Sequence, residues 1–383
     1  MSGRSLLDMI QAYDCVALVL QGGGALGAYQ AGVFEALADH GIEPRWLAGV
    51  SIGAINAALI AGNPPERRRD ALRGFWQTIS SPAFWGPMER FVAQFMAEGD
   101  GRVALNQLSA TKTLLIGQPG FFAPRLLSPF LAPPGTAEAT SFYDTTPLRA
   151  TLERFVDFAR INGGKTRLSL GAANVRTGNS VYFDTARQRI GPEHVMASGA
   201  LPPGFPAIEI EGEHYWDGGV VSNTPLQYVL DENRQRAMLV FQVDLWSARG
   251  ELPRDIISVM ERRKDITYSS RTRLNTDVAA YQQKLCNNIA TLLEKLPAEL
   301  RDAPEVAALR EAARPALVNI IHLIYRRKNY EGDNRDYEFS ELTMREHWRS
   351  GREDTAATLR HQDWLALPPH ATGTVTHDLW RKP

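Results

Sequence analysis

Near the start of this chain, a run of glycines joins the pattern of a buried strand to the pattern of a helix. Residues 15–20 read CVALVL, a short apolar run typical of a strand that is buried on both faces. Residues 22–27 (GGGALG) follow, and residues 28–41 then repeat apolar side chains along one helical stripe and end at a glycine. Residues 45–50 and 52–61 repeat the order of strand and helix. Two such units in succession predict a parallel α/β sheet.

The turn of the second unit carries a serine between two glycines. Gly49, Ser51 and Gly53 form a G-x-S-x-G pattern between the expected strand and helix. In that context, the glycines permit a strained turn that projects a nucleophile above the sheet edge. If the two expected strands are neighbours, both turns lie at the carboxyl edge of the sheet, and two helix N-termini converge on one point. We therefore interpret Ser51 as a candidate nucleophile.

The first turn fits two classes of protein. Gly22, Gly24 and Gly27 satisfy G-x-G-x-x-G, the pattern of a dinucleotide-binding loop. That interpretation needs an acidic residue near the end of the next strand to hold the ribose, and Ser51 stands there instead. A dinucleotide-binding protein is kept as the alternative, and it requires the serine turn to be a coincidence. In the hydrolase interpretation, the amides of Gly23 and Gly24 face the oxyanion that forms when Ser51 attacks a carbonyl.

A serine hydroxyl needs a base, because its free pKa is far above neutrality. None of the eight histidines sits in a motif that marks it as catalytic. Asp217 is the better candidate, since it ends a predicted strand and is followed by Gly218 and Gly219, a geometry that aims a carboxylate into a site. An aspartate in an ordinary β-turn is the alternative for this residue taken alone.

The rest of the chain divides by composition. Residues 77–145 are rich in proline, glycine and aromatic residues, and we interpret them as a lid or acyl-pocket insertion; the alternative is that their aromatic side chains complete the core. Residues 1–245 are expected to form the catalytic domain, and 246–383 a mainly helical C-terminal domain of unknown role. Further strands are predicted at 166–173, 180–183, 208–216, 237–243 and 317–325, and long helices at 254–272 and 277–296.

Composition excludes several classes of function. The 42 basic and 43 acidic residues give a formal charge of -1, which offers no general electrostatic reason to bind nucleic acid. Two cysteines are too few for a disulfide framework or a zinc cluster, and we find no motif for a metal or a cofactor. The first residues lack the apolar block of a signal peptide, and no segment has the composition of a transmembrane span, so we expect a cytoplasmic protein.

Three ordered segments give this chain a resemblance to a known family. They are GGGALGAYQAGV (22–33), GVSIGAINAA (49–58), and ASGALPPGFPAIEI leading into YWDGGVVSNTPL (197–226). Over about residues 14–245, the chain resembles the patatin-like phospholipases, which use a Ser-Asp dyad with no histidine. The resemblance implies a three-layer α/β/α fold and hydrolysis of lipid acyl esters. It also implies that Ser51 is the nucleophile, Asp217 the base, and Gly22, Gly23 and Gly24 the oxyanion loop.

Two features place this chain more closely within the family that it resembles. Leu26 stands where many plant members carry an arginine or lysine, so a charge-based role at that position is absent here. Residues 246–383, with KDITYSSRTR (264–273) and DYEFSELTMREHW (336–348), look like the C-terminal region of a bacterial subgroup that is often associated with polyhydroxybutyrate metabolism. An esterase for polyesters, or a protein that binds polyester granules, is therefore an alternative, as is peripheral contact with a membrane.

Overall fold

The chain folds around one large, mainly parallel sheet. The computed structural model describes residues 6–80, 99–232, 237–269, 272–313, 317–328, 330–369 and 373–379. The sheet has nine strands, and along it run β11 (Thr374–His377), β10 (Val318–Ile324), β9 (Met238–Asp244), β1 (Cys15–Leu20), β2 (Trp46–Val50), β5 (Arg167–Asn174), β8 (Glu213–Asp217) and β7 (Ile208–Ile210), with β6 (Ser180–Asp184) paired to β5. The pairs from β11 through to β5 are parallel. The predicted α/β class is confirmed.

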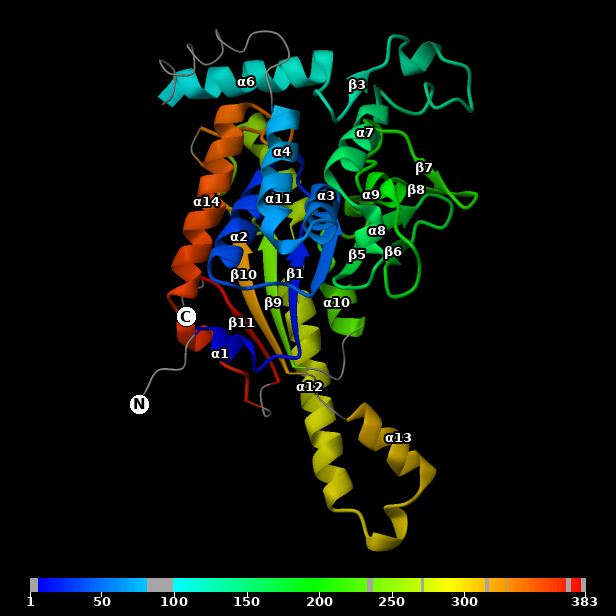
Figure 1. Ribbon diagram of the computed structural model, residues 1–383, viewed down its shortest axis with the longest axis vertical. Helices are drawn as coiled ribbons and strands as arrows, with labels where there is room; N and C mark the ends of the chain where they lie inside the picture. Colours follow the sequence, from blue (N-terminus) through cyan, green and yellow to red (C-terminus); the bar gives the residue numbers. More distant parts are fainter. Residues whose placement is uncertain are drawn as a thin grey trace.

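Helices cover both faces of the sheet, because successive strand residues point to opposite sides. On β1, Leu18 and Leu20 belong to one apolar cluster while Ala17 and Val19 belong to another. The first cluster includes residues of helices α2 (Ala28–Asp39), α3 (Ile52–Ala61), α4 (Arg68–Ser80) and α14 (Glu341–Leu359). The second cluster includes residues of α10 (Leu226–Glu232). Helix α12 (Thr272–Glu294) contacts α10 and β11. Figure 1 shows this three-layer arrangement.

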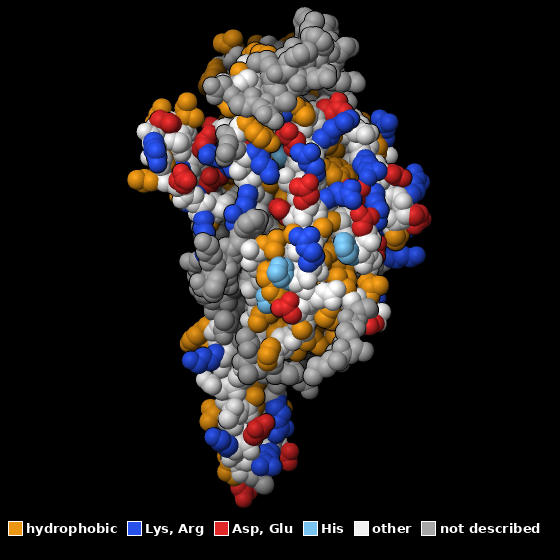
Figure 2. All heavy atoms as spheres, turned by 90° about the vertical axis from the view of Figure 1, so that its left-hand side faces the viewer, with side chains coloured by type: hydrophobic (Ala, Val, Ile, Leu, Met, Phe, Trp, Pro, Cys, Tyr) orange, Lys and Arg blue, Asp and Glu red, His pale blue; other side chains and the backbone are white. Residues whose placement is uncertain are grey.

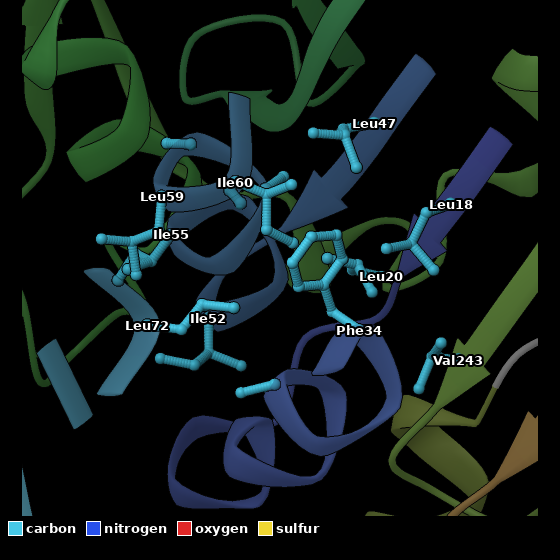
Figure 3. Close-up of a cluster of buried hydrophobic side chains, with 14 of the residues drawn as sticks. Leu18, Leu20, Phe34, Leu47, Ile52, Ile55, Leu59, Ile60, Leu72 and Val243 are labelled. Carbon is cyan, nitrogen blue, oxygen red and sulfur yellow. The ribbon is translucent and has the colours of Figure 1, made fainter. Parts of the chain in front are cut away.

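The larger cluster lies between the sheet and the helices that follow the two glycine turns. Figure 3 shows Phe34 of α2 among Leu18 and Leu20 of β1 and Leu47 of β2, with Ile52, Ile55 and Leu59 of α3 beside it. All of these side chains are buried. This packing fixes both helices on the sheet, and with them the positions of the two turns at its carboxyl edge.

Helix α2 differs from the sequence expectation of one apolar stripe. Every residue from Ala28 to Leu37 is buried, including Gln30 and Glu35. The reason is α14, which packs along the side of α2 that faces away from the sheet, as Figure 1 shows. The two helices approach closely at two glycines: a Cβ at Gly32 would lie 1.9 Å from the carbonyl oxygen of Trp348, and one at Gly351 would lie 2.1 Å from that of Tyr29.

The predicted strand at 208–216 is wrong as a single element. The structure has the antiparallel hairpin β7–β8, broken by a turn at Glu211 and Gly212. Both turn residues have positive φ values, 52° and 80°, which reverse the chain instead of extending it. The edge of the sheet is therefore antiparallel, since β8 and β6 both pair antiparallel with β5. The other expected strands are confirmed within two residues at each end.

The segment after residue 245 belongs to the same sheet in part. Strands β10 and β11 continue it beyond β9. The predicted boundary at 245/246 thus falls between neighbouring strands of one sheet, and the division into domains stays a prediction. The helices of this segment are α11 (Ile256–Tyr268), α12, α13 (Pro304–Ala312) and α14, and α12 with α13 projects past the end of the sheet opposite its carboxyl edge (Figure 1).

The remaining described elements are one long helix in the predicted insertion and shorter elements along the chain. Helix α6 (Gly99–Ile116) lies within the predicted insertion, and it crosses above the carboxyl edge of the sheet (Figure 1). Residues 81–98 of the predicted insertion lie outside the described residues. The described part of the chain also contains α1 (Leu6–Ile10), α7 (Thr146–Phe155), α8 (Phe158–Ile161), α9 (Pro192–Ser198), the two-residue pair β3 (Ala123–Pro124) and β4 (Tyr143–Asp144), and 3-10 helices at Gly24–Gly27, Pro65–Arg67, Pro129–Leu131, Gly218–Val220, Ala298–Leu300 and Gln362–Leu365.

Charges of both signs are interspersed on the face that carries α14. Figure 2 shows the face that carries α14, where blue and red side chains are interspersed. Along α14, Arg345 pairs with Glu341 of the same helix, and Arg352 lies 3.3 Å from Asp39 of α2. In the part of the chain that the structure describes, no helix is both long and apolar enough to cross a membrane.

Candidate active site

Ser51 occupies a strained turn between β2 and α3. Its φ of 57° and ψ of -126° lie where residues with a side chain are rarely found. The flanking glycines make the turn possible, because a Cβ at Gly49 would lie 2.3 Å from the carbonyl oxygen of Gly53, and one at Gly53 would lie 2.3 Å from that of Leu20. The turn predicted from G-x-S-x-G is therefore present, with Ser51 at its tip.

A serine that the sequence analysis did not single out holds this turn. The backbone N–H of Ser51 donates to the carbonyl oxygen of Ser198 at 3.0 Å and lies 3.1 Å from its Oγ. The Ser198 hydroxyl in turn donates to the carbonyl of Gly171 on β5 at 2.6 Å. Ser198 is fully buried at the end of α9. It ties the strained turn to the neighbouring strand.

Asp217 meets Ser51 because of the register on β5. Strand β2 pairs with β5 so that Val50 lies opposite Gly171, and β8 pairs so that Asp217 lies opposite Ala172. Strand β6 occupies the other edge of β5 over the same residues, so β2 and β8 share one edge and meet end to end. Ser51, which follows Val50, therefore comes beside Asp217 and donates a hydrogen bond to its carboxylate.

The Asp217 carboxyl group is buried and has a raised pKa. Only 2% of the residue is exposed. Burial raises its pKa from 3.8 to about 7, while the hydrogen bonds from the Ser51 hydroxyl and from the Gly219 N–H, the latter at 2.7 Å, act in the opposite direction. A carboxyl group with a pKa near neutrality can both accept and return a proton at physiological pH. Gly218 and Gly219 form the 3-10 turn that supplies this N–H.

The glycine loop lies in the same place, at the end of β1. Gly23 and Gly24 stand at the start of the 3-10 helix Gly24–Gly27, where N–H groups lack partners within the helix. The N–H of Gly22, by contrast, has a partner, because it donates to the carbonyl oxygen of Asn223 at 3.2 Å. A Cβ at Gly22 would lie 2.3 Å from the Asn223 Oδ1 and 3.0 Å from the Ser51 Cβ, so a larger residue there would displace Asn223. Gly27 ends the loop and begins α2.

Three polar residues around this loop were missed by the sequence analysis. The Asn223 Nδ2 donates to the carbonyl of Gly22 at 3.0 Å, and the Trp246 Nε1 donates to the same carbonyl at 2.9 Å. The Gln21 Oε1 accepts from the N–H groups of Leu245 and Trp246. The segment SNTPL after Asp217 was a signal for Asn223, since it belongs to the quoted motif. Trp246 and Gln21 carried no signal.

A cavity of about 290 Å³ connects these groups. Ser51, Asp217 and Gly22 to Gly24 line it. Many of its other lining residues are apolar, and several of these are aromatic; they include Leu114, Phe121, Phe122, Tyr143, Phe205 and Phe339. Among the described residues, no histidine lines this cavity. The predicted site residues are thus brought together on one cavity, and their catalytic roles stay predictions.

The aromatic walls come from three distant parts of the chain. Phe121 packs against Phe205 and Phe339, with ring centroids 6.0 and 5.8 Å apart, and Phe122 packs against Tyr143 at 4.9 Å. Phe121 and Phe122 belong to the predicted insertion, whereas Phe339 belongs to the C-terminal region. Four further aromatic residues of the predicted insertion, Phe84, Trp85, Phe91 and Phe95, lie outside the described residues.

In the described part of the chain, no group of three or more His, Cys, Asp or Glu side chains is arranged to hold a metal ion. Two histidines of the C-terminal region, His322 and His347, each pair with a carboxylate. His322 lies 2.7 Å from Asp244, and His347 lies 2.6 Å from the buried Glu331. Tyr325 also donates to Glu331, at 2.6 Å, so these groups pair with one another inside the fold.

Comparison with known proteins identifies the family. A family model described as patatin-like phospholipase matches residues 18–230, more than half of the chain, and spans both glycine turns and Asp217. The chain belongs to the patatin-like phospholipase family. A second model, described as patatin phospholipase, matches residues 266–371. The patatin-like part thus contains the serine turn and the glycine loop, and the second match covers most of the C-terminal region.

Individual relatives of this patatin-like phospholipase match over short stretches. Triacylglycerol lipase SDP1L of Arabidopsis thaliana is 31% identical over 88 residues, which is 23% of this chain and 11% of that protein. Patatin-like phospholipase domain-containing protein 7 of Rattus norvegicus is 47% identical over 60 residues, 16% of this chain and 4% of that protein. The chain therefore matches about a tenth or less of these relatives. The crystal structure of VipD from Legionella pneumophila superposes with a TM-score of 0.41 at 15% identity, over 91% of this chain and 67% of that chain.

Proposed function

We propose that this protein hydrolyses lipid acyl esters, with Ser51 as the nucleophile and Asp217 as the base. The observation that carries the proposal is the hydrogen bond from the Ser51 hydroxyl to a buried carboxylate, at a strained turn that opens into an apolar cavity. Family membership supports ester hydrolysis over dinucleotide binding, because the glycine loop lies within the matched region. The names of the two curated relatives, a triacylglycerol lipase and a patatin-like phospholipase, support a lipid substrate.

In the first half of the proposed reaction, Asp217 accepts the proton of the Ser51 hydroxyl as the Oγ attacks the carbonyl carbon. The carbonyl oxygen takes the negative charge, and the amides of Gly23 and Gly24 donate hydrogen bonds to it. The intermediate then expels the alkoxide, which leaves as an alcohol with the proton from Asp217. The acyl group is now bound to Ser51 as an ester.

In the second half, the Asp217 carboxylate takes a proton from a water molecule that attacks the acyl carbon. The second tetrahedral intermediate collapses, the Ser51 Oγ regains a proton from Asp217, and a carboxylic acid is released. A pKa of about 7 suits a group that must accept and return a proton twice in each cycle. No histidine is needed for either step.

The apolar cavity walls support an acyl chain as the bound part of the substrate. Aromatic and aliphatic side chains hold such a chain by removing its surface from water. The described part of the insertion also exposes apolar side chains, among them Leu126, Phe130 and Leu131, while Leu114 of α6 lines the cavity itself. We infer that this region contacts a lipid surface peripherally.

A fluorophosphonate probe tests the nucleophile directly. The purified protein should form a covalent adduct at Ser51, and the Ser51→Ala and Asp217→Asn variants should lose ester hydrolysis by about 10³-fold or more while keeping the circular dichroism of the parent. Full activity of either variant on a p-nitrophenyl ester would overturn the dyad. Tight NADH binding without labelling would favour the dinucleotide alternative.

A substrate panel tests the lipid class. It should contain a phospholipid, a lysophospholipid, a triacylglycerol and an oligomer of 3-hydroxybutyrate, each assayed with the parent protein and with Ser51→Ala. We expect hydrolysis that depends on Ser51 for at least one of the lipids with a long acyl chain. Turnover of the hydroxybutyrate oligomer alone would favour the polyester alternative.

A further inference from the structure

The C-terminal region contacts the glycine loop at its sharpest point. The N–H of Ala25 donates to the carbonyl oxygen of Asp336 at 2.8 Å. Gly24 has a φ of 56°, and a Cβ there would lie 2.0 Å from the same oxygen. The Asp336 carbonyl therefore fixes the peptide between Gly24 and Ala25. Since that peptide follows the amides of Gly23 and Gly24, its orientation sets the direction in which those amides point.

The side chain of Asp336 is held in turn by Lys264 of α11. The Lys264 Nζ lies 2.9 Å from the Asp336 Oδ1, and it donates to the carbonyl of Asp333 at 2.7 Å. It also lies 5.2 Å from the centre of the Tyr337 ring. Both charged side chains are less than a quarter exposed, so solvent screens the pair only in part. Asp336 and Tyr337 line the cavity, whereas Lys264 stands behind them.

The same helix reaches the other side of the glycine loop. The carbonyl of Tyr268, at the end of α11, accepts from the Gln21 Nε2 at 3.0 Å and from the Asn223 Nδ2 at 2.9 Å. The neighbouring Arg335 pairs with Asp265 and lies over the Trp246 ring, whose Nε1 donates to the carbonyl of Gly22. Contacts from α11 and from residues 335–336 therefore reach both ends of the loop.

We propose that Lys264 is a positioning residue for the reaction. By its ion pair with Asp336, it holds the Asp336 carbonyl against Gly24 and Ala25 and thereby aims the loop amides at the oxyanion. This inference rests on the proposed function. Hydrogen-bond donors stabilise a developing charge only in a narrow geometry, so a small displacement of the loop lowers turnover without removing any group that binds the substrate.

The test compares Lys264→Met with a matched control. Methionine keeps the length and apolar stem of lysine but removes its charge. Lys165→Met makes the same change at an exposed turn far along the chain from the loop. On a water-soluble short-chain ester, we expect Lys264→Met to lower kcat by about tenfold or more with KM within about twofold. Lys264→Arg, which keeps the charge, should recover part of kcat, and Lys165→Met should match the parent.

The outcomes separate this inference from the proposed function. If kcat of Lys264→Met equals that of the parent, or if only KM rises, the positioning role is wrong, although Ser51 is still the nucleophile as long as Ser51→Ala is inactive. If Ser51→Ala retains activity, the proposed function itself fails. If Lys264→Met does not fold by circular dichroism, Asp336→Asn decides, since it keeps the side-chain shape and the backbone carbonyl. An unchanged kcat in that variant would overturn the inference.

Discussion

At the scale of single residues, the site combines two features that cost stability. Ser51 sits in a strained backbone conformation, and Asp217 carries a carboxyl group that burial holds away from water. Neither would persist in an isolated turn. The serine turn is held by the hydrogen bond from the Ser51 N–H to Ser198 and by the one from the Ser198 hydroxyl to the Gly171 carbonyl. The Gly219 N–H donates to the Asp217 carboxylate and holds the aspartate. Two predictions about Asp217 follow from this conflict.

The first prediction concerns the pH dependence of turnover. A base must be deprotonated in the free enzyme, and the pKa of Asp217 is about 7. We therefore expect kcat/KM on a soluble ester to rise about tenfold per pH unit below pH 7 and to reach a plateau above it. An activity profile that is flat between pH 5 and 8 would contradict Asp217 as the base.

The second prediction concerns stability. Because the folded state raises the pKa of Asp217 from 3.8 to about 7, it binds a proton more tightly than the unfolded chain does. The protonated Asp217 therefore stabilises the folded state fully below about pH 4, and this stabilisation is lost as the pH rises through about 7. The loss in the free energy of unfolding is at most about 4 kcal/mol. Asp217→Asn removes the cost of ionisation, so its urea-unfolding free energy should exceed that of the parent by about 1–3 kcal/mol at pH 8. At pH 4 the two proteins should differ by less; an equal difference at both pH values would contradict the prediction.

At the scale of elements, close contacts and strand register decide where the site lies. Helix α2 leaves the glycine loop and is held between the sheet and α14, where Gly32 and Gly351 let the two backbones approach. Strand β5 aligns the end of β2 with the end of β8, and so places Ser51 beside Asp217. The aromatic cluster then joins the insertion to the C-terminal region around the cavity.

Gly351→Ala should destabilise the protein. The added Cβ would lie 2.1 Å from the Tyr29 carbonyl oxygen, and it cannot fit unless the helices separate. We expect a loss of about 1–3 kcal/mol in urea unfolding. Gly332→Ala is the matched control, because the nearest atom to its Cβ would be 3.4 Å away, and its effect should stay within about 0.5 kcal/mol. Equal effects of the two substitutions would show that the helix contact is not tight.

Phe121→Ala should change the preference for acyl chains. The side chain is buried between Phe122, Phe205 and Phe339, and its loss enlarges the cavity beside Ser51. We expect the optimum in a series of p-nitrophenyl esters to shift to longer or bulkier chains. Phe183→Ala is the control, since Phe183 is equally buried but lies away from the cavity, against His194 and Tyr215. The same shift in both variants would point to a general loosening of the fold.

At the scale of the whole molecule, the C-terminal region completes both the sheet and the site. Strand β10 covers the edge of β9 and β11 extends the sheet beyond it. Helix α14 packs against α2, and Asp336, Tyr337 and Phe339 line the cavity. A chain cut after residue 245 would expose the β9 edge and the buried face of α2.

The truncated chain 1–245 should therefore be insoluble or unfolded. Expression of this fragment beside the full chain, with the soluble fraction compared on a gel, checks the expectation. A soluble monomeric fragment with native-like circular dichroism would contradict it, and would support the division into two domains that composition predicts at residue 245.

The sequence by itself determined the local parts of this protein. The order of strand, glycine turn and helix, the serine turn and the short buried strands follow from backbone restrictions and from side-chain periodicity, which act over a few residues. The hairpin at Glu211 and Gly212 was missed, although the alternating pattern stops at residues 211–214 (EGEH) and Gly212 is a turn signal. The same motifs singled out Ser51, Asp217 and the glycine loop as candidates.

Only the tertiary structure decided how these parts meet. The register on β5 brings Asp217 to Ser51, and it depends on pairing between segments far apart in the chain. The all-round burial of α2, the wall formed by Phe339 and the contact of Asp336 with Gly24 depend on where the C-terminal region packs. No local pattern encodes such contacts, because each is selected by the free energy of burying two distant surfaces against each other.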